Sequence, residues 1–273
     1  MLIKDVFRGI KCPNCGDYHD ATLKKCPSCN KDNELFQIRR VPKRVVFLHP
    51  FAQIGLFLVG FAYGGMFVAE LIAAVFAAFM DGDAAFKSAV LMGVIYGSML
   101  VGLLIIALFS GRRKYFLEKY TNGIDYLYGI GYAITVVVVS TLVGAIVSIF
   151  HESSSNANQS AIELVALNYP LLSLFTIAIM GPVCEELTYR VGLYSFLRRF
   201  NKYLAFIITV IIFAMIHFDF TAENIIDEVW SLPSYLAAGF VLTLAYEHRG
   251  PACSMIAHIL YNTIAFALVF IPK

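Results

Sequence analysis

Seven long apolar segments constrain this chain more than any other feature. A helix that crosses a membrane needs about 20 mostly apolar residues. The chain is 59% hydrophobic and only 15% charged, well below the roughly 25% charge of soluble domains. We therefore expect an all-α fold, a polytopic membrane helical bundle with about seven spans, at about residues 47–79, 86–110, 124–150, 161–183, 203–219, 230–247 and 252–271.

Basic residues are unevenly distributed along the chain. Ten of the 21 lysines and arginines lie in residues 1–44, and others follow the second span or precede the fifth and seventh. The alternate loops carry almost none, and basic loops stay on the cytoplasmic side. We expect a cytoplasmic N-terminus, without a cleaved leader because no apolar stretch precedes residue 44, in a plasma membrane that the general layout suggests is bacterial. The net charge of +2 gives no indication of nucleic-acid binding.

Four cysteines crowd the polar N-terminal segment. KCPNC and KCPSC are two knuckles separated by ten residues, and their thiolates can surround one tetrahedral zinc ion at Cys12, Cys15, Cys26 and Cys29. A segment this short buries little core, so the metal would supply its folding energy. The pattern resembles a zinc ribbon, either a small structural module or a docking or sensing module. The basic segment 37–44 that follows is typical of an anchor for an anionic leaflet.

Three charges lie within six positions of the sequence GPVCEELTYR, between long apolar runs. A charge in the hydrocarbon core costs about 2.5–3.5 kcal/mol on insertion scales, so such groups are paired or functional. Glu186 and Arg190 are four residues apart on a helix and can pair. Glu185 lies about 100° around the helix axis from Glu186 and has no local partner, so we expect it to face other helices.

The later apolar segments supply candidate partners for Glu185. His217 lies near the end of the fifth span, and His258 and Asn262 are one turn apart in the seventh. Counting from the turn at residues 198–202, helices with a rise of 1.5 Å per residue bring Glu185 and His217 to one depth. A glutamate helped by a histidine can activate water, and a second histidine with an asparagine can stabilise an oxyanion.

Metal chemistry at the same residues is an alternative. Two histidines and one carboxylate form a known zinc-binding set, so Glu185, His217 and His258 could hold an ion, although we favour no metal in the active site. The sequence has neither an H-E-x-x-H motif nor a serine in a nucleophile motif.

Three motifs, in order, resemble the CPBP intramembrane proteases, also called the Abi family, which include the type II CAAX prenyl endopeptidase. They are Glu-Glu-x-x-x-Arg at 185–190, Phe-x-x-x-His at 213–217 and His-x-x-x-Asn at 258–262. The resemblance covers about residues 160–270. The chain departs from the pattern at Val191, where glycine is common, with Gly192 one place late, and at Tyr189, where phenylalanine is common.

The resemblance implies an intramembrane endopeptidase acting on a membrane-associated peptide or a lipidated or membrane protein. Glu185 with His217 would activate water, His258 and Asn262 would form the oxyanion hole, and Glu186 and Arg190 would hold the helix. The expected parts are 1–44, zinc ribbon and linker; 45–158, N-terminal helices; and 159–273, protease core. The rival functions are a non-catalytic membrane scaffold or regulator of the same fold, disfavoured by the complete residue set, and a small transporter, disfavoured by the lack of an inverted repeat.

Overall fold

The computed structural model describes residues 9–20, 22–33, 44–64, 67–151 and 157–271. Of the basic segment 37–44, all but Arg44 lies outside these residues. The described part of the chain is almost entirely helical, with one small two-stranded sheet near the N-terminus. The expected all-α fold class is confirmed.

The N-terminal cysteines form a compact unit, called here the cysteine module (described residues 9–20 and 22–33). Strands β1 (Ile10–Lys11) and β2 (Tyr18–His19) pair antiparallel, with Ile10 opposite His19. The residue after each knuckle, Gly16 in one and Asn30 in the other, has a positive φ and donates its N–H to the first cysteine of that knuckle. Glycine and asparagine tolerate this left-handed conformation, so each knuckle turns its two thiols to the same side.

The first half of the membrane part is built from helices of very different lengths. They are α3 (Pro50–Gly64), α4 (Phe67–Phe79), α5 (Ala84–Leu108), α6 (Arg113–Glu118), α7 (Gly123–Phe150) and α8 (Ala157–Asn168).

The second half contains one long composite helix and three further helices in its described residues. The composite helix joins α9 (Pro170–Ser173), η1 (Leu174–Met180), α10 (Gly181–Glu185), η2 (Glu186–Tyr194) and α11 (Ser195–Arg198), where η marks π-helical turns. It is followed by α12 (Lys202–Met215), α13 (Ile225–Arg249) and α14 (Pro251–Leu268).

Five helical stretches of the described chain are long and apolar enough to cross a membrane, namely 84–108, 123–150, 170–198, 225–249 and 251–268, and two apolar helices, 50–63 and 202–215, are shorter. The count of about seven spans therefore stays a prediction. Two segments differ from the sequence-based expectation. The first apolar segment is divided between α3 and α4, and the fourth helix begins at Pro170 and continues to Arg198 instead of covering 161–183. Proline suits the first turn of a helix, where its missing N–H is not needed.

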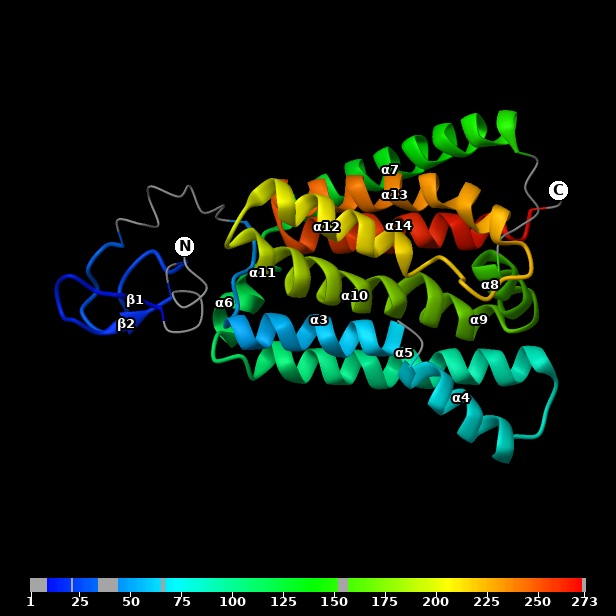
Figure 1. Ribbon diagram of the computed structural model, residues 1–273, viewed down its shortest axis with the longest axis horizontal. Helices are drawn as coiled ribbons and strands as arrows, with labels where there is room; N and C mark the ends of the chain where they lie inside the picture. Colours follow the sequence, from blue (N-terminus) through cyan, green and yellow to red (C-terminus); the bar gives the residue numbers. More distant parts are fainter. Residues whose placement is uncertain (1–8, 21, 34–43, 65–66, 152–156, 272–273) are drawn as a thin grey trace.

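The composite helix lies at the centre of the bundle. Figure 1 shows it between α3 and α5 on one side and α12, α13 and α14 on the other, with the cysteine module at one end of the molecule. Direct packing joins η2 to α3 and to α12, and η1 to α14. The proposed division of the chain at residues 44 and 158 stays a prediction.

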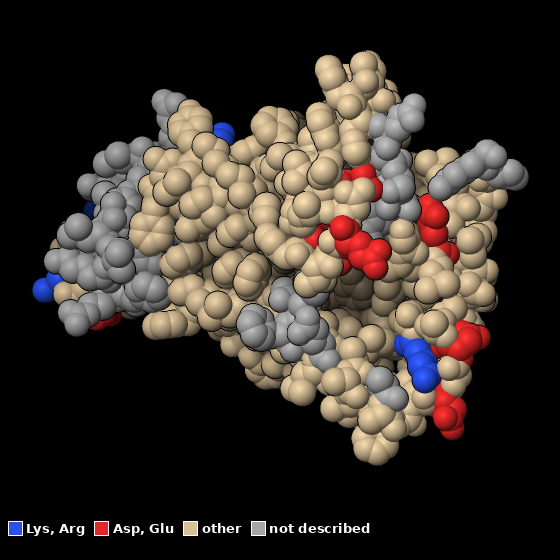
Figure 2. All heavy atoms as spheres, turned by 45° about the vertical axis from the view of Figure 1, so that its right-hand side comes forward, with Lys and Arg blue, Asp and Glu red and all other residues tan. Residues whose placement is uncertain are grey.

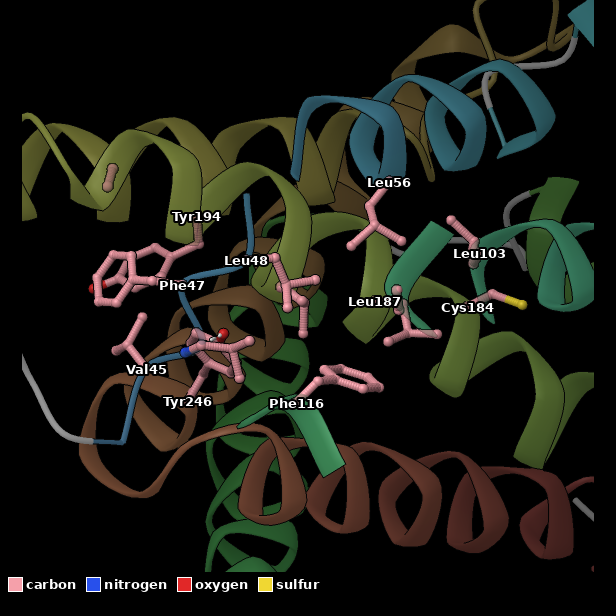
Figure 3. Packing of buried hydrophobic residues seen from close by; sticks show 14 of the residues in the cluster. Val45, Phe47, Leu48, Leu56, Leu103, Phe116, Cys184, Leu187, Tyr194 and Tyr246 are labelled. Carbon is pink, nitrogen blue, oxygen red and sulfur yellow. Dashed lines mark hydrogen bonds between the residues drawn. The ribbon is translucent and has the colours of Figure 1, made fainter. Parts of the chain in front are cut away.

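A hydrophobic core holds this central helix in place. The segment before α3 contributes Val45, Phe47 and Leu48, all buried, and they pack with side chains of α5, α6, α10, η2 and α13. Figure 3 shows Leu187 and Cys184 of the composite helix facing Leu103, Leu56 and Phe116. Cys184 is fully buried here and serves as an apolar packing residue. This core fixes one face of the composite helix. The rotation of the helix about its axis, and therefore the direction in which Glu185 and Glu186 project, is fixed with it.

Candidate active site

The composite helix widens just before the two glutamates. Pro182 cannot donate a backbone hydrogen bond, and the Gly181 N–H bonds to Thr176 O, five residues back, instead of four. Such π-helical turns frequently occur at functional sites. Glu185 ends the short α-helical stretch α10 that lies between the two widened stretches, and Glu186 begins the second of them, η2.

Glu186 is a fully buried carboxylate with two partners. Its Oε1 lies 3.0 Å from Arg190 Nη1, and both side chains have no exposed surface. The same oxygen lies 3.0 Å from His258 Nδ1. A carboxylate only accepts hydrogen bonds, so the proton of the His258 ring sits on Nδ1 and its Nε2 points to the other side.

Glu185 occupies the space on that other side. Its Oε2 lies 3.6 Å from His258 Nε2, and its side chain is 13% exposed. This oxygen is buried and makes no hydrogen bond with any residue that the structure describes. His258 thus stands between the two glutamates, bonded to one and close to the other, an arrangement that the sequence motifs did not predict.

His217 is held at the C-terminal end of α12 by two contacts. Its Nδ1 donates to Phe213 O at 2.8 Å, and its ring stacks on Tyr235 of α13 with centroids 4.4 Å apart and an interplanar angle of 21°. Because Nδ1 carries the proton, Nε2 presents a lone pair. Glu185 is near enough to act on His217 electrostatically, but the imidazole within 4.0 Å of its carboxylate is that of His258.

Phe213 brings the motif residues together. Its buried ring lies 5.0 Å from the ring of His217 and 5.8 Å from that of His258, centroid to centroid. The Arg190 guanidinium lies over the same ring at 4.2 Å, and Tyr189 meets it edge-on at 5.9 Å. Aromatic and cation–π contacts of this kind stabilise a fixed geometry. One apolar side chain therefore positions both imidazoles relative to the arginine.

Asn262 lies one turn beyond His258 on α14. Its Nδ2 donates to Ile177 O of η1 at 3.3 Å. An amide nitrogen has two hydrogens, so the second can bond to another acceptor. The structure therefore gathers Glu185, Glu186, Arg190, His217 and His258 around Phe213, with Asn262 at the η1 side of the group.

Two residues of this site carried no signal in the sequence. Tyr235 lies within an apolar segment, and nothing in that segment indicates that its ring meets His217. Gln53 lies in α3 and donates to Val191 O at 3.2 Å, next to Arg190. Gln53 differs from an ordinary surface glutamine in being fully buried, and the sequence alone does not show that burial.

The cysteine module fits a metal ion. The four thiols lie within 4.8 Å of one another, and among the described residues this is the group found to converge in this way. Four converging cysteine sulfurs suit a tetrahedral ion.

Comparison with known proteins supports the motif assignment. Residues 167–264 match the family described as type II CAAX prenyl endopeptidase Rce1-like. The chain is 27% identical over 145 residues to the UPF0177 protein YvdC of Lactococcus lactis subsp. lactis (strain IL1403), covering 53% of this chain and 52% of the relative. It is 32% identical over 101 residues to the UPF0177 protein in abiGi 5'region of Lactococcus lactis subsp. cremoris, covering 37% and 39%.

The chain thus matches about half or less of the length of these curated relatives. No solved structure matches it. The family match contains all three motifs and every residue assigned above to the candidate site apart from Gln53. The resemblance drawn from the motifs is confirmed, because residues 167–264, which contain all three motifs, match the type II CAAX prenyl endopeptidase Rce1-like family.

Proposed function

We propose that this protein is an intramembrane endopeptidase that hydrolyses a peptide bond with water activated by Glu185 and His217. The main support is the Glu185 carboxylate, whose buried Oε2 lies beside an imidazole and makes no hydrogen bond with the described residues. The three guanidinium nitrogens of Arg190 and Oε2 of Glu186 are also buried and make no hydrogen bond with the described residues. Buried polar groups in folded proteins are almost always satisfied, often by ordered water, so this part of the bundle suits a hydrolytic reaction.

The proposed reaction uses two hydrogen-bond acceptors, the Glu185 carboxylate and Nε2 of His217. Glu185 takes a proton from water while the lone pair of His217 Nε2 accepts the second water hydrogen. The water oxygen then attacks the peptide carbonyl carbon, and the carbonyl electrons move onto oxygen. When this intermediate collapses, the C–N bond breaks, and the protonated Glu185 returns its proton to the leaving amine.

The developing oxyanion needs hydrogen-bond donors. Asn262 offers its second amide hydrogen. His258 donates from Nδ1 to Glu186, so its Nε2 can donate to an oxyanion only if the ring is the imidazolium. Glu186 accepts the Nδ1 hydrogen and so holds the ring with Nε2 towards Glu185. In this proposal Glu186 orients His258, and Arg190 balances the charge of Glu186.

We further propose that the substrate is a membrane-associated peptide or a lipidated protein, since the site is buried among helices long enough to span a bilayer. Basic residues cluster near the cysteine module, and Figure 2 shows acidic side chains gathered towards the opposite end of the molecule. This asymmetry supports a cytoplasmic location of the cysteine module, and the two Lactococcus lactis relatives support a bacterial plasma membrane. Zinc is the proposed ion of that module, because four cysteines are a typical set for structural zinc.

The experiment that tests this function is peptide cleavage by the purified full-length protein in detergent. The probes are an internally quenched fluorogenic peptide and the same peptide carrying a C-terminal prenyl group. Glu185→Gln and His217→Ala should each lower kcat/KM about 10²- to 10⁴-fold, the usual contribution of a general base. Glu223→Gln, a change at an exposed acid of the 219–224 loop, is the matched control and should cleave as the wild type does.

The alternative outcomes are distinct. Equal cleavage by wild type and Glu185→Gln, or no cleavage of either probe by the folded wild type, would contradict the enzyme and favour the scaffold. A chelator added to wild type and to Cys12→Ser separates glutamate-activated water from a metal at Glu185, His217 and His258. Loss of cleavage by chelator even in Cys12→Ser would point to a metal in the active site.

A further inference from the structure

The cysteine module meets the membrane part through a single carboxylate among the described residues. Asp20 follows β2, and its Oδ1 accepts hydrogen bonds from the Thr22 N–H and hydroxyl at 2.8 and 2.7 Å. Its Oδ2 lies 3.0 Å from Arg199 Nη1 and 3.2 Å from Arg112 Nη2. The Asp20 and Arg199 side chains are 10% and 1% exposed, so this contact is an ion pair shielded from solvent.

Arg199 continues the contact into the bundle. It lies directly after the composite helix, and its Nε donates to Gln53 Oε1 at 2.9 Å while its Nη2 donates to Leu48 O at 2.5 Å. Arg112 donates in parallel to Phe47 O. The Arg199 guanidinium therefore has partners on three sides, and Asp20 is the acidic one.

Gln53 carries the contact to the helix of the candidate site. Its side chain is fully buried, and its Nε2 donates to Val191 O and to Val46 O, each at 3.2 Å. Val191 directly follows Arg190, whose guanidinium faces Glu186. The backbones of α3 and η2 are in close contact here, because a Cβ on Gly192 would lie 2.9 Å from Phe57 N.

We propose that Asp20 is a positioning residue for the candidate active site, acting through Arg199, Gln53 and Val191. The proposal rests on the endopeptidase function above and adds a role for the cysteine module. With its cysteines bound to a metal, the module holds Asp20 against Arg199, which fixes Gln53 and with it the turn of η2 that carries Glu186 and Arg190. Without that carboxylate, Arg199 is a buried cation with no acidic partner, which is strongly unfavourable. It then seeks water or other acceptors, and the Gln53 side chain loses its fixed orientation.

Hydrogen–deuterium exchange of the full chain in detergent tests the coupling without reference to activity. Asp20→Asn keeps the side-chain shape and an acceptor for Thr22 but removes the charge. Amides of residues 46–57 and 186–194 should exchange at least about tenfold faster in this variant, because local opening becomes easier. Asp32→Asn is the matched control, since Asp32 lies in the same module and forms a largely exposed pair with Lys25. Unchanged exchange in Asp20→Asn would overturn the proposal.

Loss of the metal should have the same effect as loss of the carboxylate. Cys29→Ser, with metal content measured per chain, should accelerate exchange in the same two segments. If the module acts through Asp20, the double variant Cys29→Ser/Asp20→Asn should match the single variants, because changes along one pathway are not additive. Additive effects in the double variant would contradict a route through Asp20 and show that the module and this carboxylate act separately.

Cleavage kinetics supply the second readout. Misplacement of catalytic groups by about 1 Å can cost about 10²-fold, so Asp20→Asn should lower kcat by about 10- to 100-fold with little change in KM. Asp20→Glu restores the charge and should recover part of kcat, which a variant that merely fails to fold would not allow. If the wild type cleaves nothing, the enzyme proposal fails while the exchange experiment still decides the coupling. If the wild type cleaves and Asp20→Asn retains full kcat and slow exchange, the positioning role is wrong and the enzyme stands.

Discussion

Arg190 is the largest fully buried side chain among the described residues. It is fully buried, faces the Glu186 carboxylate and lies over the Phe213 ring. Its three nitrogens make no hydrogen bond with the described residues, so ion pairing and the aromatic face provide its stabilisation. An unpaired charge here would be costly, which explains why the Glu186–Arg190 spacing of one helical turn matters.

We expect Arg190→Met to destabilise the fold by about 3–5 kcal/mol, because it leaves the Glu186 carboxylate buried without its guanidinium partner. The measurement is equilibrium unfolding in mixed detergent micelles. Arg113→Met, at an exposed arginine of α6, should change the free energy of unfolding by less than about 0.5 kcal/mol. If Arg190→Met and Arg113→Met lowered the free energy of unfolding equally, the buried Glu186–Arg190 pair would add no stability beyond that of an exposed arginine.

The ring and the hydroxyl of Tyr235 make different contacts, so their roles can be tested separately. The ring stacks on His217, while the hydroxyl accepts a hydrogen bond from Asn158 of α8 at 3.1 Å. An aromatic pair is worth about 0.5–1.5 kcal/mol. Tyr235→Leu should therefore lower kcat/KM by about 2- to 13-fold, whereas Tyr235→Phe should retain most of the cleavage of the fluorogenic peptide. An equal loss in Tyr235→Phe and in Tyr235→Leu would assign the role to the hydroxyl, which both variants lack.

At the scale of elements, α3 and η2 pack closely against each other. A Cβ on Gly60 would lie 1.8 Å from Thr188 Oγ1 and 2.5 Å from its Cγ2. Glycine on both helices allows their backbones to approach, as small residues do in membrane helix pairs. This close approach also explains the use of Gly192, which still packs against α3 although it comes one place later than in the family pattern.

Gly60→Ala should lower the thermal midpoint of the purified protein, since overpacking a tight contact typically costs about 1–3 kcal/mol. Gly131→Ala is the control, because a Cβ at this position of α7 meets nothing within 4 Å. We expect Gly131→Ala to leave the midpoint unchanged or to raise it slightly. If Gly60→Ala has the same thermal midpoint as the wild type, the Thr188 side chain can move aside, and the contact between α3 and η2 at Gly60 is not tight.

The elements differ in how far the sequence could predict them. Apolar segment lengths indicated the long helices, and the distance from the turn at 198–202 placed Glu185 and His217 at similar depth, because a regular helical rise needs no tertiary information. The division of the first apolar segment between α3 and α4 was not predicted, since its apolar composition is continuous. The helix start at Pro170 carried a signal in the proline itself, which segment length alone did not use. The contacts of His258 with both glutamates, of Tyr235 with His217 and of Asp20 with Arg199 join residues far apart in the chain. Only packing specifies such pairs.

At the scale of the whole molecule, a polar junction joins the two parts of the protein. Burial raises the pKa of Asp20, but Arg199 and Arg112, with hydrogen bonds from Thr22, outweigh it and hold the pKa of this carboxyl below its ordinary value. A carboxyl with a lowered pKa stabilises the folded state fully above its unfolded pKa of about 4. That contribution is lost as the pH falls through the lower, folded-state pKa.

The difference in thermal midpoint between wild type and Asp20→Asn should therefore be constant above about pH 5 and shrink below about pH 4. Midpoints measured across this range, with metal content determined at each pH, check the prediction and exclude a trivial effect of metal loss. Asp32→Asn should differ from wild type by a small, nearly constant amount. A wild-type advantage over Asp20→Asn that grows at acid pH would have the wrong sign for a paired aspartate.

The π-helical turn closed by the Gly181–Thr176 hydrogen bond affects how this protein should be aligned with distant relatives. Each such turn accommodates one residue more than an α-helical turn while keeping the same faces towards the neighbouring helices. A relative that is α-helical throughout would need one residue fewer between the equivalents of Leu174 and Met180 to present its two acidic side chains in the same direction. An alignment with a single-residue gap between Leu174 and Met180, and another between Glu186 and Gly192, would keep the charged residues and the glycine in register. An alignment without these gaps would misassign every position on one side of each π-helical turn.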